Sequence, residues 1–319
     1  MAEEQNTVPT GLDGLRRELV SHWNMLPEKG FFFGLATLWF ALFQFFGNST
    51  FGYIDTPSLF RWLYSAYNGE FTDDGHGNLI PWVVLGLFWW KRDELAAVSK
   101  RIWPPALLGV AAGLFLHLTG YITQQPRISA VGFFMGLYFL MGLAWGRSWL
   151  RASFFPFVLF VFSVPVGSLA EAITFPLRHL VSIISVGFSH VVLGMDVLRD
   201  GTRIYDPRGA FEYDVAPACS GIRSLISLLA LTTIYGFVTF KTGWKRAVTV
   251  LAALPLALIG NTARIVAVIV TAEAFGEKAG MRVHDGAGFI TFGIAIGCIM
   301  LMGFLMREEN PPANEKERS

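Results

Sequence analysis

The chain has 319 residues, of which 53% are hydrophobic and only 15% are charged. A soluble domain carries about 25% charged residues, which cover its surface, so the composition predicts an integral membrane protein. The formal net charge of +1 provides no basic field of the kind that attracts nucleic acid, and no nucleic-acid partner is expected. Two cysteines are too few for a disulfide-rich scaffold.

Apolar segments recur along the whole chain. A spanning helix needs about 20 mostly apolar residues, with a lower limit of roughly 17. We therefore predict an all-α polytopic membrane protein with about eight transmembrane helices. The predicted spans are 31–47, 79–90, 103–121, 129–145, 152–169, 222–240, 247–267 and 287–306. The second span is short unless it takes in flanking residues.

The distribution of Lys and Arg predicts the orientation, because short basic loops stay on the cytoplasmic side. Basic residues follow the second, fourth, sixth and eighth spans, within 91–101, 147–151, 241–246 and at Arg307. This agrees with cytoplasmic N- and C-termini and an even number of spans. The acidic loop 69–78 and the region from Glu171 to Gly221 then lie outside.

Residues 176–197 are apolar but carry a polar stripe, formed by His179, Ser182, Ser185, Ser189 and His190. Because these positions share one helical face, we predict an amphipathic helix on the outer membrane surface, with partial insertion left open. The following "TRIY" and "AFEYDV" are typical of short strands, which predicts a small extracytoplasmic hairpin. Glycines at 109/113, 132/136 and 293/297 have the spacing that allows close helix packing.

Three residues of chemical interest are predicted to meet at one membrane face. Cys219 directly precedes an inward-running span. Arg264 lies roughly 26 Å along the next helix from its cytoplasmic end, at about 1.5 Å per residue. His284 is expected in the outer loop before the last span. A thiol, a guanidinium and an imidazole would thus come together from three helix ends.

These residue types fit nucleophilic catalysis. A nearby cation and a helix start both favour the thiolate of Cys219, and Ser220 and Gly221 would let backbone N–H groups approach a reacting carbonyl. His284 can act as general base and then as general acid. Arg264 can stabilise an oxyanion.

Further side chains could support such a site. Arg223 is placed to bind a substrate carboxylate or a lipid phosphate, and Asn261 to hydrogen-bond across the site. Each feature also has a plain structural explanation. A lone cysteine is usually inert, an arginine can extend to the headgroups, and a loop histidine is usually solvated. Arg264 within an apolar helix weighs against that explanation, because intramembrane charges are costly and usually functional.

Other chemistries have little support in the sequence. The chain contains no HExxH or GxSxG motif. Asp73, Asp74 and His76 form at best a weak metal-binding pattern, and we expect no metal or cofactor. Cys298 lies about 20 Å deeper than His284 if the segment is helical, so we expect it to be inert.

The segments "ACSGIRSL" (218–225) and "NTARIV" (261–266), followed by His284 before a final apolar helix, resemble the exosortase/archaeosortase family. These are multi-pass membrane proteins regarded as cysteine transpeptidases or proteases. The resemblance covers most of the chain, including an early His-Gly segment at His76. It implies Cys219 as nucleophile, with Arg264 and His284 as the other catalytic residues. Histidine at the third position favours a bacterial member, in the cytoplasmic (inner) membrane.

The resemblance implies substrates that end in a short motif, a transmembrane helix and a basic tail. Their C-terminal sorting signal would be cleaved at the outer face, with sortase-like chemistry on an unrelated fold. The catalytic domain would span 31–306, between a cytoplasmic segment 1–30 and a disordered cytoplasmic tail 307–319. A membrane acyltransferase that uses the same thiol, and less favoured a transporter, are the alternatives. The recognised motif, the acceptor and the oligomeric state stay open.

Overall fold

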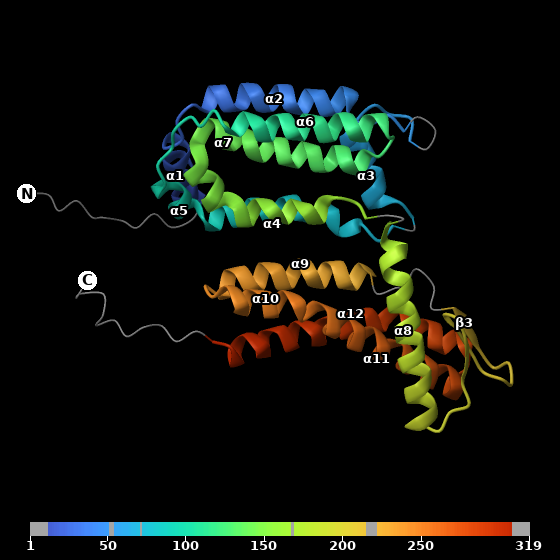
Figure 1. Ribbon diagram of the computed structural model, residues 1–319. Coiled ribbons are helices and arrows are strands. Elements are labelled where there is room, and N and C mark those ends of the chain that lie inside the picture. The colour runs from blue at the N-terminus through green and yellow to red at the C-terminus, as the bar shows by residue number, and fades with distance from the viewer. Residues whose placement is uncertain (1–11, 51–53, 71, 167–168, 215–221, 308–319) are drawn as a thin grey trace, which may run out of the picture. The chain divides into compact units, whose positions relative to one another are not determined.

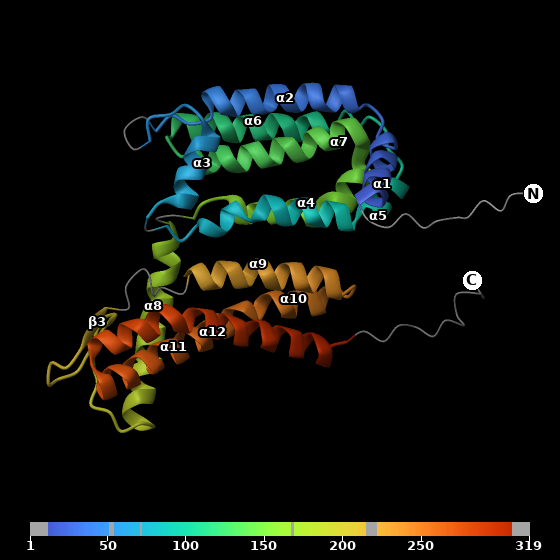
Figure 2. The same cartoon turned by 180° about the vertical axis from the view of Figure 1, so that it is seen from behind.

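The computed structural model describes residues 12–50, 54–70, 72–166, 169–214 and 222–307, so the predicted tail lies almost wholly outside it. The described chain is mostly helical and forms two compact units (Figures 1 and 2). The N-terminal unit comprises residues 1–69 and 77–165, and the C-terminal unit comprises 70–76 and 166–319.

The N-terminal unit is built from helices. They are α1 (Leu12–Asn24), α2 (Lys29–Phe46), α3 (Leu59–Asn68), α4 (Ile80–Trp90), α5 (Arg92–Ala97), α6 (Ala106–Ile122), α7 (Pro126–Val158) and the 3-10 helix η2 (Leu159–Ser163). A further 3-10 helix, η1 (Gly75–Asn78), lies at the sequence boundary between the units.

The C-terminal unit combines helices with a small sheet. Its elements are α8 (Leu169–Val191), β1 (Leu198–Asp200), β2 (Arg203–Tyr205), β3 (Glu212–Asp214), α9 (Ile222–Thr239), α10 (Gly243–Leu251), α11 (Ala253–Phe275) and α12 (Glu277–Leu305).

Each predicted span overlaps helical structure, although the fifth, predicted at 152–169, is helical without interruption only as far as Ser163. Within the described residues, four helical segments are long and apolar enough to cross a membrane: Lys29–Phe46, Pro126–Ser163, Gly243–Phe275 and Glu277–Leu305. Three shorter apolar helices lie at Ile80–Trp90, Ala106–Ile122 and Ser224–Thr239. The helical membrane class is therefore confirmed, while the number of crossings stays a prediction.

The fourth and fifth predicted spans are two legs of one element, α7. The chain reverses at Gly146, whose φ of 93° lies in the region that favours glycine. The Cβ of any other residue there would stand 2.6 Å from the carbonyl oxygen of Arg101. We expected a loop at 146–151, but a single glycine makes the turn, and helix resumes immediately.

Glycines allow α6 and α7 to pack in close contact. A Cβ at Gly132 would lie 2.6 Å from the carbonyl oxygen of Gly113, and one at Gly113 would lie 3.0 Å from the Cα of Gly136. The close packing predicted from the first two glycine pairs is therefore confirmed. Gly293 and Gly297 have open space around their Cβ positions, so the third pair makes no such contact within the described chain.

The basic segments predicted to be cytoplasmic lie together in pairs. In the N-terminal unit, Lys91 Nζ donates to the carbonyl oxygen of Ala152 at 2.7 Å, which joins the loop after α4 to the second leg of α7. In the C-terminal unit, Lys245 Nζ donates to the carbonyl oxygen of Met306 at 2.9 Å, which joins α10 to the end of α12. Each unit thus gathers its basic loops at one end.

The serines of the polar stripe on α8 face the protein, whereas His190 of the same stripe is exposed. Ser182, Ser185 and Ser189 are fully buried, and Ser182 Oγ donates to the carbonyl oxygen of His179 at 2.8 Å. Apart from His190, large exposed side chains of the helix are apolar, among them Phe175, Ile183, Phe188 and Val191. An amphipathic helix on a membrane surface would turn its polar stripe to water, whereas the three serines of α8 are turned inward. It crosses α11 at a steep angle (Figures 1 and 2).

The predicted hairpin is present and has one more strand. Strand β2 pairs antiparallel with both β1 and β3, with Ile204 opposite Arg199 and Tyr213. A buried apolar cluster joins the sheet to α8 and α11; it contains Val181, Val197, Ile204, Phe211, Ile265, Ile269 and Ala272.

Polar contacts fix the same sheet to the turn between α11 and α12. Tyr213 Oη donates to the carbonyl oxygen of Glu277 at 2.8 Å, and Arg208 forms ion pairs with Asp206 and Glu273. The buried carboxylate of Asp206 accepts hydrogen bonds from Ala210 N at 3.0 Å and from Arg208 Nε at 3.2 Å. Burial alone would raise the pKa of Asp206, but these hydrogen bonds and the charge of Arg208 outweigh burial and lower that pKa.

The α6–α7 contact predicts the effect of one added methyl group. Gly132→Ala should destabilise the protein by about 1–3 kcal/mol, because the backbone of α6 must move away. Thermal unfolding in detergent would measure the loss. Gly34→Ala, on α2 with open space at its Cβ position, is the matched control, and equal melting temperatures for the two variants would contradict the packing described.

Asp206 predicts a pH-dependent contribution to stability. A carboxyl whose pKa is lowered by folding stabilises the protein above its unfolded pKa of about 3.9, and this contribution is lost as the pH falls through the folded value. Asp206→Asn should therefore lower the melting temperature at neutral pH, with a difference from wild type that shrinks below about pH 4. Asp200→Asn, at an exposed position, should show neither effect.

Candidate functional site

The predicted site residues divide into those that the structure describes and those that it does not. Cys219, Ser220 and Gly221 lie outside the described residues. Arg223 is in the first turn of α9, with its side chain also outside the description. The structure describes Arg264, His284, Asn261 and His76. Arg264 and His284 are joined by hydrogen bonds and are here called the bonded pair.

Arg264 on α11 binds His284 on α12 through two of its nitrogens. Nε donates to the backbone carbonyl oxygen of His284 at 3.1 Å, and Nη2 donates to the imidazole Nε2 at 3.0 Å. Both side chains are partly buried. The guanidinium thus holds the main chain and the ring of one residue at the same time, which fixes the ring relative to α11.

The guanidinium contacts both nitrogens of the His284 ring, because Arg264 Nη2 also lies 3.5 Å from the imidazole Nδ1. A guanidinium has donors and no acceptor, so a ring nitrogen that accepts from it must offer a lone pair. Each neutral tautomer of histidine has one such nitrogen, and the contact is compatible with both. A neutral His284 can accept a proton at that nitrogen once the guanidinium moves away.

Both residues lie inside helices, and our expectation that they lie at helix ends was wrong. Arg264 is near the middle of α11, and His284 is on the second full turn of α12. The apolar pattern weakens at Glu273, Glu277 and Lys278, but these residues are compatible with a helix. The helices therefore continue to a turn at Gly276, whose φ is 84°, and the sheet packs on this extension.

A small cavity adjoins the guanidinium. It has a volume of about 20 Å³, enough for one water molecule, and it lies between α9, α11 and α12. Its polar lining comes from Ser224, Asn261, Arg264 and Thr291. Asn261 is 7% exposed and also lines a second small cavity toward α8, which agrees with its predicted place beside Arg264.

Three further positions at this site were not predicted. Ser224 brings the first turn of α9 to the cavity, and Thr291 brings α12. Gly288 lies over the guanidinium, since a Cβ there would be 3.8 Å from Arg264 Nη1. A serine, a threonine and a glycine in apolar helices are common, so the sequence gives no signal that distinguishes them.

The remaining candidates have less definite surroundings. His76 is in η1, and its buried Nδ1 has no hydrogen-bond partner among the described residues. Asp74 Oδ1 accepts from the backbone N–H of Val166 at 3.0 Å, which is a structural role. The described residues contain no group of three His, Cys, Asp or Glu side chains able to hold a metal ion. Cys298 is an exposed free thiol on α12, four turns beyond His284.

Comparison with known proteins agrees with the resemblance seen in the sequence. Residues 70–301 match the family described as transmembrane exosortase, and the match covers the whole Arg264–His284 site. The chain belongs to the transmembrane exosortase family. No curated protein and no solved structure matches it. The exosortase match, together with the apolar helices, establishes a membrane protein of a transpeptidase-like or protease-like class.

The bonded pair predicts the chemical reactivity of His284 in this exosortase. Arg264→Ala removes the guanidinium from both ring nitrogens, so diethyl pyrocarbonate should modify His284 several-fold faster than in wild type. Peptide mass spectrometry would give the rate, with the exposed His190 as internal reference. Equal rates at His284 in the two proteins would mean that the guanidinium does not shield the ring in the membrane.

Proposed function

We propose that this exosortase is a membrane cysteine protease and transpeptidase that removes the C-terminal sorting signal of exported proteins. The observation that carries the proposal is the contact of Arg264 with His284, two residues on different helices that the family resemblance implies as catalytic. A guanidinium and a neutral imidazole are the groups that a thiol nucleophile requires beside it.

Chain connectivity supports Cys219 as that nucleophile. Cys219 is five residues before Ser224, and Ser224 lines the same cavity as Arg264. At no more than about 3.6 Å per residue, the Cα atoms of Cys219 and Ser224 are within roughly 18 Å of each other. The chain length between Cys219 and Ser224 therefore allows the thiol to reach the cavity that Arg264 lines.

In the proposed reaction, His284 takes the thiol proton of Cys219 and the sulfur attacks the scissile carbonyl. A tetrahedral intermediate forms, the C–N bond breaks, and His284 returns the proton to the departing amine. The C-terminal helix fragment leaves, and the substrate is held as a thioester. An acceptor amine, or water, then attacks the thioester and restores the thiol.

The resting geometry implies that Arg264 changes partners during this cycle. While Nη2 contacts the ring nitrogens of His284, the ring is not free to act as a base. We infer that the developing oxyanion draws the guanidinium away from the ring, while the Nε bond to the carbonyl oxygen of His284 keeps it nearby. The backbone N–H groups of Ser220 and Gly221 would complete the oxyanion site.

The membrane arrangement follows from the same residues. With the paired basic loops in the cytoplasm, the N- and C-termini are cytoplasmic, and the Arg264–His284 pair lies toward the outer face of the bacterial cytoplasmic membrane. A substrate anchored by its own C-terminal helix would present its motif there. Arg223 and His76 are proposed to contact the substrate, and the acceptor is left undefined.

Processing of a co-expressed substrate with a motif–helix–basic tail tests this function. Wild type should shorten the substrate, and Cys219→Ala should leave it full length at equal membrane abundance. Cys298→Ala, the matched control at the other cysteine, should process normally. Processing by Cys219→Ala would refute the mechanism. An acylated but uncleaved substrate would instead favour an acyltransferase.

A further inference from the structure

The two legs of α7 present matching apolar stripes to each other. On the first leg, Val131, Phe134, Met135 and Tyr138 follow the i, i+3, i+4, i+7 spacing of one helical face. This face is distinct from the glycine face that packs on α6, at Gly132 and Gly136. The first leg therefore has a second packing surface, which is turned toward the returning chain.

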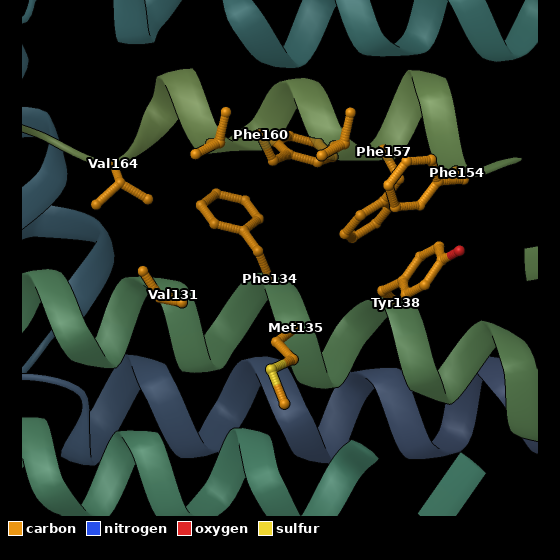
Figure 3. A pocket seen from close by; sticks show the side chains of 10 residues that line it. Val131, Phe134, Met135, Tyr138, Phe154, Phe157, Phe160 and Val164 are labelled. Carbon is orange, nitrogen blue, oxygen red and sulfur yellow. The ribbon is translucent and has the colours of Figure 1, made fainter.

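The second leg repeats the spacing. Phe154, Phe157, Val158 and Val161 lie at i, i+3, i+4 and i+7 along the end of α7 and η2. Side chains from the two legs face each other in Figure 3. Ring contacts join the legs, Phe134 with Phe160 at 4.6 Å and Tyr138 with Phe157 at 5.0 Å between ring centroids.

These contacts leave a cavity of about 210 Å³ between the legs, here called the α7 cleft. Its lining consists of valine, phenylalanine and methionine side chains and the ring of Tyr138. The Tyr138 hydroxyl donates to the carbonyl oxygen of Leu150 at 2.5 Å, so its hydrogen is already bonded within the protein. Cavities with such walls stay dry and accept apolar molecules.

The cleft is open toward the surroundings of the protein. On its rim, Val131, Phe154 and Val161 are 42%, 52% and 60% exposed. The segment Pro126–Ser163 is one of the membrane-spanning candidates, with a mean hydropathy of 1.8, so the medium at this rim is bilayer hydrocarbon. The Tyr138–Leu150 hydrogen bond joins the legs near the Gly146 reversal.

From these observations we propose that the α7 cleft binds the hydrocarbon tail of a membrane lipid. Protein interiors contain few voids larger than a water molecule, so a dry cavity of this size that opens to hydrocarbon is filled from there. An α-helix with side chains is about 10–12 Å across and does not fit between the legs, whereas a run of methylene groups does. The tail would hold the legs of α7 at their present separation.

Photolabelling of the full-length protein tests the proposal. The protein is reconstituted in phosphatidylcholine vesicles that contain phosphatidylcholine with a diazirine in one acyl chain, and adducts are mapped by peptide mass spectrometry. We expect labelling to concentrate on 131–138 and 154–161. Val158→Phe narrows the cleft and should reduce this labelling several-fold. Leu108→Phe, at a 78% exposed position on α6, is the matched control and should leave it unchanged.

Two further variants keep the test decisive if Val158→Phe does not fold. If Val158→Phe fails to fold, Val131→Phe narrows the cleft from the other leg, and Met135→Ala, which enlarges the cleft, should keep or increase the labelling. Adducts spread evenly over all apolar helices, or labelling that is insensitive to the narrowing variants, would overturn the proposal. Both results would mean ordinary contact with bulk lipid.

Discussion

The bond between Arg264 and His284 constrains the whole C-terminal unit. A guanidinium within apolar helices must have acceptors, and α12 supplies a ring nitrogen and a carbonyl oxygen from one residue. This demand sets the register of α12 against α11. Apolar clusters on either side of the pair, one with the sheet and α8 and one with α9, then exclude alternatives to that register.

Sequence patterns predicted the helices well where the helical segment is also the apolar segment. The spans expected at 79–90 and 222–240 became α4 and α9 almost residue for residue. The patterns failed where a helix extends beyond its apolar residues. Hydropathy reports which residues avoid water. It therefore placed the end of one span at 267 and the start of the next at 287, whereas α11 continues to Phe275 and α12 begins at Glu277. At Gly146, nearby Arg147 and Arg151 suggested a loop, but the reversal needs one glycine.

The candidate site divides in the same way. Arg264, His284 and Asn261 were predictable because charged and amide side chains stand out in apolar helices. Ser224 and Thr291 were not, because hydroxyl side chains occur there routinely with their bonds satisfied by their own helix. The serines on α8 show that a polar helical face need not be turned to water. In a membrane protein, small polar residues pack inward and large apolar ones face lipid.

The turn at Gly276 has a consequence for how the protein is assembled. Arg264 and His284 are separated by only 20 positions, and one glycine with positive φ joins their helices. A pair this close in sequence has a small loop-closure cost. The guanidinium and the imidazole can therefore associate as soon as the final helical hairpin, α11 with α12, enters the membrane, without contributions from distant parts of the chain.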